Sequence, residues 1–430
     1  MKKALFKIAI IFLLAIIGYY TYLYIKEKTT VYDHKVVVCI PVYGQSYALG
    51  EEAIRITDFD SLKIKYDGRI VTEHMDYVFG YFDHSSRLKQ YVKRLLHYDK
   101  KAFELSVYGM AEALVPQLGE DTIVCIFPGG HGMNTILELM KPVEPYDKFI
   151  EEIAYAYQKA IDRGWEFYVP AICWMQGESD IAEYPNTDYK ALFHQMYNNL
   201  NTDIRNITHQ QDNIQMICYQ TSTITKGGRY KLNNFDAQEP RTPTIQMEMI
   251  REDSLIWASG PTYPYHFVRE ALHIDATGQK SIGALAALSA LKIIRHKAPS
   301  IGLMPLDFRV SENQIRIPFH VPCPPLCLDT INVRKADNYG FNVIRKDNTD
   351  IISNIEIHQD TVIITCKESP IGCKIRYAVN GEYLKGGCQS GPRGNLRDSQ
   401  GDNQLIVISG KTYPLHNWCY MFDYLCTPNK

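Results

Sequence analysis

Between residues 35 and 295 the chain alternates short apolar runs with segments whose apolar residues recur at helical spacing. This alternation constrains the fold more than any other feature. The first apolar run, Val36–Pro41, is continuous, which is typical of a strand buried on both faces. Asp147–Arg163 has the spacing of a helix that buries one face, and the alanine-rich Thr277–Ile294 closes the series. We therefore predict a three-layer α/β fold, in which a parallel sheet is covered by helices on both faces.

The other elements of this region follow the same order. Further strands are predicted at Thr122–Phe127, Phe167–Cys173, Ile214–Tyr219 and Ser254–Ala258. Further helices are predicted at Glu104–Leu118, at Thr187–Asn206 and from Thr242-Pro243 onward, where proline suits the first helical position. Before the first of these helices, Leu62–Val71 is predicted to form a hairpin that turns at Tyr66-Asp67-Gly68.

The pattern changes after Pro299. Strand-like segments separated by turn residues are found there at Asp307–Phe319, Thr330–Val333, Phe341–Arg345, Ile351–Cys366, Lys374–Val379 and Gln404–Ser409. This spacing favours a smaller all-β sandwich. We expect three parts: an N-terminal segment (residues 1–30), an α/β domain (31–298) and a C-terminal β-sandwich (299–430), to which the sequence assigns no chemistry.

The N-terminal segment contains a stretch without charged residues, Ile8 to Ile25, preceded by Lys2, Lys3 and Lys7. Its eighteen residues would span about 27 Å as a helix, close to the hydrocarbon thickness of a bilayer. The sequence lacks a small-residue cleavage site after this stretch, so we predict an uncleaved membrane anchor with the remainder of the chain exported. The alternative is a cleaved signal peptide and a secreted protein.

Charge and composition narrow the range of functions. The net charge is −2, so no basic field favours binding to nucleic acid. Hydrophobic residues make up 46% of the chain, enough for packed cores in two domains. The sequence does not indicate an oligomeric state.

The eleven cysteines form two groups. Cys39, Cys125, Cys173 and Cys218 lie inside apolar runs and are expected to be core residues. The other seven lie between Cys323 and Cys426, where export would permit disulfides. Cys323/Cys327, Cys366/Cys373 and Cys419/Cys426 are neighbours in sequence, although spacing alone does not fix the pairing. No histidines at ligand spacing accompany them, so a zinc site is not expected.

Three short segments carry side chains suited to catalysis. Ser46 follows the first predicted strand in Gly44-Gln45-Ser46, and Gln176 follows another strand in Trp174–Asp180. His273 ends the tetrapeptide Glu270-Ala271-Leu272-His273. Because ligands bind at the carboxyl ends of parallel strands, we expect these segments to meet at one edge of the sheet.

Together these residues supply the parts of an acyl-transfer site. Ser46 would be the nucleophile, His273 its base and Glu270 the carboxylate that orients the base. Gln176 would donate to the oxyanion, with backbone N–H groups of Ser46 and of the Gly129-Gly130 turn. Taken singly, the serine would cap a helix, the acidic pair Glu178/Asp180 would form a solvated turn, and the histidine would be structural.

The same motifs resemble those of the SGNH hydrolases, in particular the branch of sialate O-acetylesterases and acetyl xylan esterases. The resemblance rests on GQS followed by Gly50, the Gly-Gly turn, the WMQGESD segment, the acid-x-x-His tetrapeptide and the glycines Gly278 and Gly283. It covers roughly residues 35–295. It implies a flavodoxin-like sheet, Ser46 as nucleophile, His273 as base, Glu270 as orienting acid, and Ser46, Gly130 and Gln176 as the oxyanion hole.

The chain departs from the family pattern at two positions. Tyr47 stands where the family commonly has asparagine, and Glu270 where it commonly has aspartate. The second difference leaves Glu178 as an alternative or assisting acid for His273.

The expected function is a serine esterase that removes O-acetyl groups from a carbohydrate, with no metal or organic cofactor. Sialic acid, xylan and peptidoglycan would all qualify as the acetylated partner. One alternative is a lipase or thioesterase of another class, which the α/β-hydrolase motif G-x-S-x-G does not favour, because Ala48 stands at the second glycine position. The other alternative is a catalytically silent carbohydrate-binding protein.

Overall fold

The α/β region contains the predicted parallel sheet. The computed structural model describes residues 12–21, 34–72, 103–183, 188–222, 241–382 and 385–428. One set of parallel strands has the order β3 (Ile70–Val71), β4 (Thr122–Cys125), β1 (Val36–Cys39), β6 (Glu166–Tyr168). The other has the order β5 (Pro128–Gly130), β2 (Val42–Gly44), β7 (Ala171–Met175), β8 (Gln215–Gln220), β9 (Ile256–Pro261). Backbone hydrogen bonds from Val42 to Phe127 and from Cys173 to Pro41 join the two sets into one continuous sheet.

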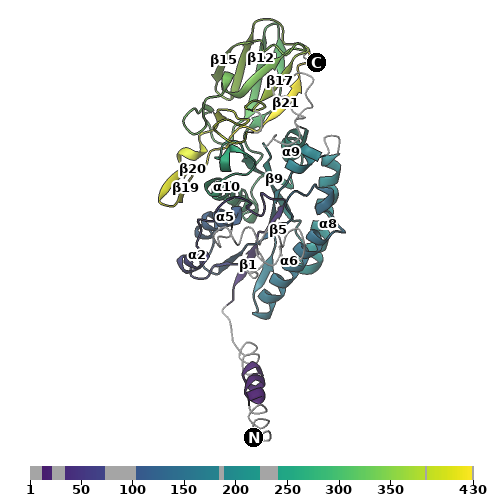
Figure 1. The fold of residues 1–430 in the computed structure, drawn as a ribbon, viewed down its shortest axis with the longest axis vertical. Coiled ribbons are helices and arrows are strands. Elements are labelled where there is room, and N and C mark those ends of the chain that lie inside the picture. The colour runs from purple at the N-terminus through teal and green to yellow at the C-terminus, as the bar shows by residue number, and fades with distance from the viewer. Residues whose placement is uncertain are drawn as a thin grey trace.

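Helices cover both faces of this sheet, as predicted (Figure 1). Helices α5 (Ser106–Leu114) and α10 (Ala276–Ile294) pack against each other and share a core with the strands on one face. Helices α6 (Glu144–Asp162), α8 (Tyr189–Thr208) and α9 (Arg241–Glu252) cover the opposite face. The short helix α7 (Glu178–Glu183) follows β7 directly. The three-layer α/β fold is therefore confirmed.

The hairpin predicted at Leu62–Val71 is wrong in its first half. Helix α2 (Phe59–Lys65) occupies that half, and its turn at Tyr66–Gly68 leads into β3. The side chain of Asp58 accepts a hydrogen bond from the backbone N–H of Asp60 and so caps the helix. The turn was predicted correctly, but the capping residue lies before the segment whose apolar pattern was used.

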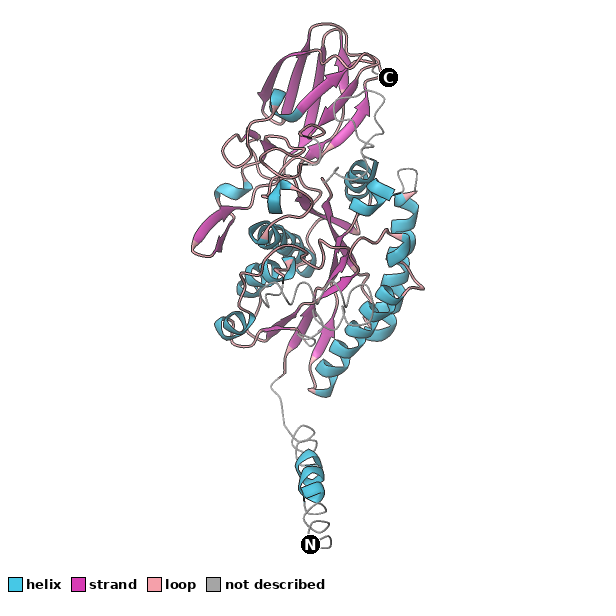
Figure 2. Ribbon diagram, viewed as in Figure 1, coloured by secondary structure: helices cyan, strands magenta, loops and turns pink. Residues whose placement is uncertain are grey.

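Antiparallel strands make up the region after residue 300 (Figure 2). One sheet contains β10 (Met304–Pro305), β11 (Arg309–Ser311), β12 (Gln314–His320), β16 (Thr361–Cys366) and β15 (Ile352–His358). A second contains β14 (Phe341–Ile344), β17 (Lys374–Tyr377) and β21 (Phe422–Leu425). Two further pairs are β13 (Cys327–Leu328) with β18 (Leu396–Arg397), and β19 (Leu405–Ile408) with β20 (Lys411–Pro414). We call residues 304–428 the β-module.

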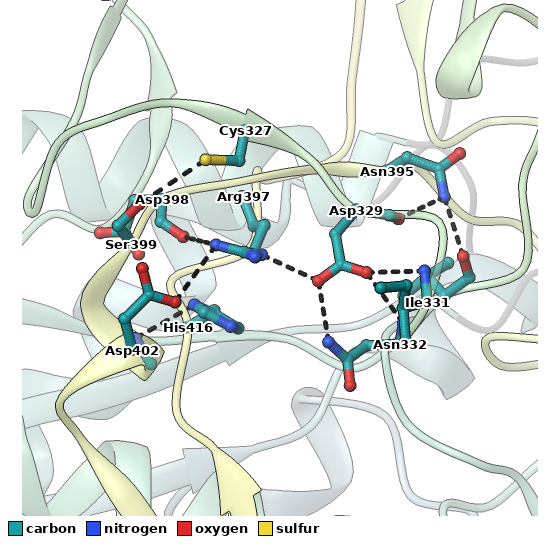
Figure 3. Close-up of polar contacts among 12 residues, drawn as sticks. Cys327, Asp329, Ile331, Asn332, Asn395, Arg397, Asp398, Ser399, Asp402 and His416 are labelled. Carbon is teal, nitrogen blue, oxygen red and sulfur yellow. Dashed lines mark hydrogen bonds and ion pairs between the residues drawn. The ribbon is translucent and has the colours of Figure 1, made fainter.

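The strand predicted at Thr330–Val333 is wrong, because this segment forms bends. The carboxylate of Asp329 accepts hydrogen bonds from the backbone N–H groups of Ile331 and Asn332 (2.9 and 2.8 Å). It also pairs with Arg397 Nε at 2.8 Å (Figure 3). Such local side-chain contacts give the backbone an alternative to a sheet ladder.

The β-module and the α/β region share buried contacts. The Tyr263 hydroxyl donates to the carbonyl of Cys419 (2.8 Å), and the backbone N–H of Gly260 donates to the Tyr420 hydroxyl (3.1 Å). The Gln220 side chain bonds both backbone groups of Met421 (2.9 and 2.7 Å). Since these groups are buried, the two regions are packed as one body rather than joined only by a linker.

The cysteines and the N-terminal segment complete the comparison with the sequence. All eleven cysteines are present as thiols, including the neighbours considered for pairing. The predicted anchor Ile8–Ile25 lies only in part within the described residues, which cover a helical stretch at residues 12–21. Within the described part of the chain, no helix combines the length and apolar character needed to cross a bilayer.

Candidate active site

The nucleophile candidate lies where the sheet topology predicts. Strand β2 ends at Gly44, and the segment that follows, Gly44–Ala53, is called the nucleophile loop. A Cβ atom at Gly44 would lie 2.0 Å from the carbonyl oxygen of Met175, so only glycine allows β2 and β7 to end this close together. Gln45 N–H then bonds the same carbonyl at 3.0 Å, and Ser46 follows, buried at the carboxyl edge of the sheet.

Ser46 and His273 are far apart in the sequence but in contact in the structure. Ser46 Oγ lies 2.8 Å from His273 Nε2, although 227 residues separate them. His273 ends a tight turn, Val268–His273, which is called the base turn, and the backbone N–H of Val268 donates to the His273 carbonyl at 2.8 Å. The structure therefore brings together the two residues predicted as nucleophile and base.

The other nitrogen of the ring contacts a carboxylate that sequence reasoning missed. His273 Nδ1 lies 2.8 Å from Glu52 Oε2. An ionised carboxylate can only accept a hydrogen bond, so Nδ1 carries the proton and Nε2 is left to accept one from the Ser46 hydroxyl. The hydrogen bond from His273 lowers the pKa of Glu52, and nearby Arg269 lowers it further, so Glu52 is ionised at neutral pH.

Glu270 does not take the place expected for it. In the part of the chain that the structure describes, its carboxylate accepts a hydrogen bond from the Ser390 hydroxyl and lies 4.0 Å from Lys385 Nζ. Both partners belong to the β-module. The backbone explains the difference: Arg269 and Glu270 have φ values of 55° and 51°, so the chain is in the left-handed region where the tetrapeptide begins. The expected pairing of Glu270 with His273 is thus replaced by Glu52.

Glu178, the alternative acid, is also engaged elsewhere. The Tyr219 hydroxyl lies 2.7 and 2.6 Å from its two carboxylate oxygens. Burial raises the pKa of Glu178, and the hydrogen bonds and the charge of His273 only partly offset that rise. Glu178 is therefore a buried acid beside the site rather than a hydrogen-bond partner of the ring.

Tyr47 contributes to the placement of the base. Its ring packs against those of Tyr219 and His273, with centroids 5.7 and 5.4 Å apart. Its hydroxyl donates to the carbonyl of Leu272 at 2.6 Å. The tyrosine that departs from the family pattern thus bridges the nucleophile loop and the base turn.

A second carboxyl in the nucleophile loop adds to the electrostatics of the site. Burial raises the pKa of Glu51, while His273 and His131 act in the opposite direction. Space beside it is limited, since a Cβ atom at Gly132 would lie 2.3 Å from Glu51 Oε1. The two neighbouring carboxyl groups therefore have different environments. Glu52 is ionised and hydrogen-bonded to the His273 ring, whereas Glu51 is buried and has no such bond to His273.

The amide predicted for the oxyanion hole is fully buried and already hydrogen-bonded. Gln176 Nε2 donates to the Asp180 carboxylate and to the carbonyl of Asn134 (3.3 Å), and its Oε1 accepts from the Tyr189 hydroxyl (3.0 Å). Donation to an oxyanion therefore requires exchange of one contact, and the longer one, to Asn134, is the weaker.

Gly130, the other predicted contributor, is opposite Gly44 in the β2–β5 register. Its φ of +116° and the 1.7 Å that would separate a Cβ from the Gly44 carbonyl oxygen both require glycine. Gly130 therefore lies at the same sheet edge as Ser46. Among the described residues, no group of three or more His, Cys, Asp or Glu side chains is placed to hold a metal ion.

Comparison with known proteins identifies a family for part of the chain. Residues 96–292 match the family model "Carbohydrate esterase, sialic acid-specific acetylesterase". That range includes Gly130, Gln176 and His273, whereas Ser46 and Glu52 precede it. No curated protein matches the chain.

Solved structures are similar at low sequence identity. A carbohydrate acetylesterase from Xanthomonas citri has a TM-score of 0.52 and 13% identity, over 80% of this chain and 75% of that one. NanS has a TM-score of 0.41 and 13% identity, over 62% of this chain and 100% of that one. A protein from Arabidopsis thaliana has a TM-score of 0.40 and 13% identity, over 60% of this chain and 99% of that one. The first of these similarities shows a shared fold.

Proposed function

We propose that this chain removes O-acetyl groups from sialic acid through an acetyl-serine on Ser46. The chain belongs to the carbohydrate esterase family of sialic acid-specific acetylesterases and is therefore an ester hydrolase. The observation that carries the proposal is the row of hydrogen bonds Ser46–His273–Glu52, with 2.8 Å at each step. The same row disfavours a catalytically silent binding protein, since a silent site has no need of this alignment.

The proposed reaction begins with attack of Ser46 Oγ on the acetyl carbonyl carbon. His273 Nε2 accepts the hydroxyl proton as the bond forms, and the Glu52 carboxylate stabilises the resulting imidazolium. His273 then gives the proton to the sugar oxygen as the ester bond breaks, and the deacetylated sugar leaves. A water molecule next attacks the acetyl-serine, His273 takes its proton and returns it to Ser46, and acetate departs.

The oxyanion formed in both steps needs hydrogen-bond donors at the carboxyl edge of the sheet. We assign this role to the backbone N–H groups of Ser46 and Gly130 and to the amide of Gln176. Gln176 would exchange its 3.3 Å contact with Asn134 for the shorter, charge-assisted bond to the oxyanion.

The test of the proposed function is acetate release from a panel of O-acetylated substrates. O-acetylated sialic acid should be hydrolysed with a higher kcat/KM than acetylated xylan or peptidoglycan fragments. Ser46→Ala should abolish release from every member, and a fluorophosphonate probe should label the wild type and not this variant. Preference for xylan or peptidoglycan would overturn the substrate, and failure to label would overturn the mechanism.

We further propose that the chain is held at a membrane by its N-terminal segment, with the esterase exported. Support comes from the charge-free stretch Ile8 to Ile25 and the lysines before it. The full-length protein should sediment with membranes and resist carbonate extraction. A mature soluble chain starting near residue 30 would show cleavage instead.

A further inference from the structure

The base turn holds two consecutive residues in a conformation that their side chains disfavour. Arg269 and Glu270 have φ values of 55° and 51°, in the left-handed region, and neither is glycine or asparagine. Such conformations persist only where surrounding contacts hold them. The turn ends at His273, so whatever holds it also sets the position of the base.

Besides the Tyr47 hydroxyl on the Leu272 carbonyl, the contacts that hold the turn come from the β-module. The backbone N–H of Gly386 donates to the Glu270 carbonyl at 3.0 Å, and the hydroxyl of buried Ser390 donates to the Glu270 carboxylate. The backbone N–H of Cys388 donates to the Tyr265 carbonyl, also at 3.0 Å. A Cβ atom at Gly386 would lie 2.2 Å from the Ala271 carbonyl oxygen, so glycine is required for this approach. Residues 385–391 of the module are thus built closely against the turn.

The base turn also positions residues of the candidate site. Its first and last residues are joined by the bond from Val268 N–H to the His273 carbonyl at 2.8 Å. Arg269 forms an ion pair with Glu52, the carboxylate on His273. The Arg269 side chain is 75% exposed, so it is not held in position by burial. Its position follows instead from the direction of the backbone in the turn.

We propose that the β-module completes the active site, with Glu270 as the positioning residue that connects them. Through Glu270 and Ser390 the module holds the base turn so that His273 meets Ser46 and Arg269 meets Glu52. This gives the acidic residue of the E-x-x-H tetrapeptide a role different from that of an orienting acid. The inference rests on the proposed function, since it assumes that His273 is the base.

The test compares three substitutions by their effects on kcat and KM. Glu270→Ala and Ser390→Ala each remove the contact from one side, and each should lower kcat by about tenfold to a hundredfold with little change in KM. Glu270→Gln should keep most of the activity, because its amide oxygen still accepts from the Ser390 hydroxyl. The double variant Glu270→Ala/Ser390→Ala should have a kcat no lower than that of the less active single variant, since the two residues act through one contact.

The control is Ser353→Ala, which removes an exposed hydroxyl from β15 of the same module and should leave kcat unchanged. Melting temperatures identify any variant that fails to fold, and Ser390→Ala remains the milder test if Glu270→Ala is unstable. If Glu270→Gln is as damaging as Glu270→Ala while Ser390→Ala is silent, Glu270 orients the base directly and the proposal is overturned. An active Ser46→Ala variant would instead overturn the proposed function and leave the contact itself unaffected.

Discussion

The nucleophile loop and the base turn meet at several hydrogen bonds, from Ser46, Tyr47 and Glu52 of the loop, yet they are held in place in different ways. The nucleophile loop continues from β2 and is fixed by the sheet itself, through Gly44 and the bond from Gln45 to Met175. The base turn lies beyond β9, and its left-handed residues are held by hydrogen bonds from the β-module. The comparison indicates that the nucleophile is presented at the end of a sheet strand, whereas the base depends also on contacts from the β-module.

The largest effect is expected from the nucleophile loop. Ser46→Ala should lower turnover of p-nitrophenyl acetate by about 10⁴-fold or more, because it removes the hydroxyl that forms the acetyl-enzyme in the proposed reaction. The melting temperature should stay close to that of the wild type, since a single buried hydroxyl is lost. Activity above a few per cent of wild type would place the nucleophile elsewhere.

A second change in the same loop tests the unexpected acid. Glu52→Gln should lower kcat by about 10³–10⁴-fold, because the amide no longer selects the tautomer of His273 that accepts the serine proton. Steady-state kinetics beside Glu270→Gln and Glu178→Gln sharpen the assignment, as both of these variants should retain most of the activity. A crippled Glu178→Gln with a nearly normal Glu52→Gln would return the role to Glu178.

The oxyanion donor lies outside both segments and should have a smaller effect. Gln176→Ala is expected to lower kcat by about 10²–10³-fold and leave KM nearly unchanged, since the donor acts only as charge develops. Separate determination of kcat and KM checks this. A raised KM at constant kcat would mean that Gln176 binds the ground state instead.

The base turn also offers a small effect that sharpens the comparison. Arg269→Ala removes an ion pair whose cation is 75% exposed, and exposed pairs contribute little. We expect a fall in kcat of about two- to fivefold, well below the effect of Glu270→Ala. If the two variants were equal, the β-module would act on the site through Arg269 and Glu52 rather than through His273.

The smallest effect concerns stability at acid pH. The pKa of Glu52 is lowered in the folded protein, chiefly by the hydrogen bond from His273. Its stabilising contribution is therefore fully present above the unfolded value of about 4.3 and is lost as the pH falls through the lower folded value. The difference in melting temperature between wild type and Glu52→Gln should be largest near pH 6 and should shrink toward pH 3. A difference in melting temperature that does not change with pH would show that the pKa of Glu52 is the same in the folded and unfolded protein.

Elements with a strong local signal were predicted well. The strands at residues 36–41 and 122–127 and the helix near residues 147–163 agree with β1, β4 and α6 to within a few residues. The failures occurred where side chains outside the apolar pattern decided the backbone. Asp58 caps a helix where a hairpin was expected, and Asp329 binds two backbone N–H groups where a strand was expected.

The candidate site shows the same division. The sequence alone predicted the parallel α/β architecture and a sheet edge shared by Ser46 and His273, because hydrophobic periodicity is a local property that indicates where strands lie. Only the tertiary structure decided which carboxylate serves the histidine. Glu52 is 221 residues from His273, and Glu270 turns instead to Ser390, 120 residues away. Hydrogen bonds of this kind depend on the conformations of two distant loops, and those conformations are held by packing between regions that no short motif records.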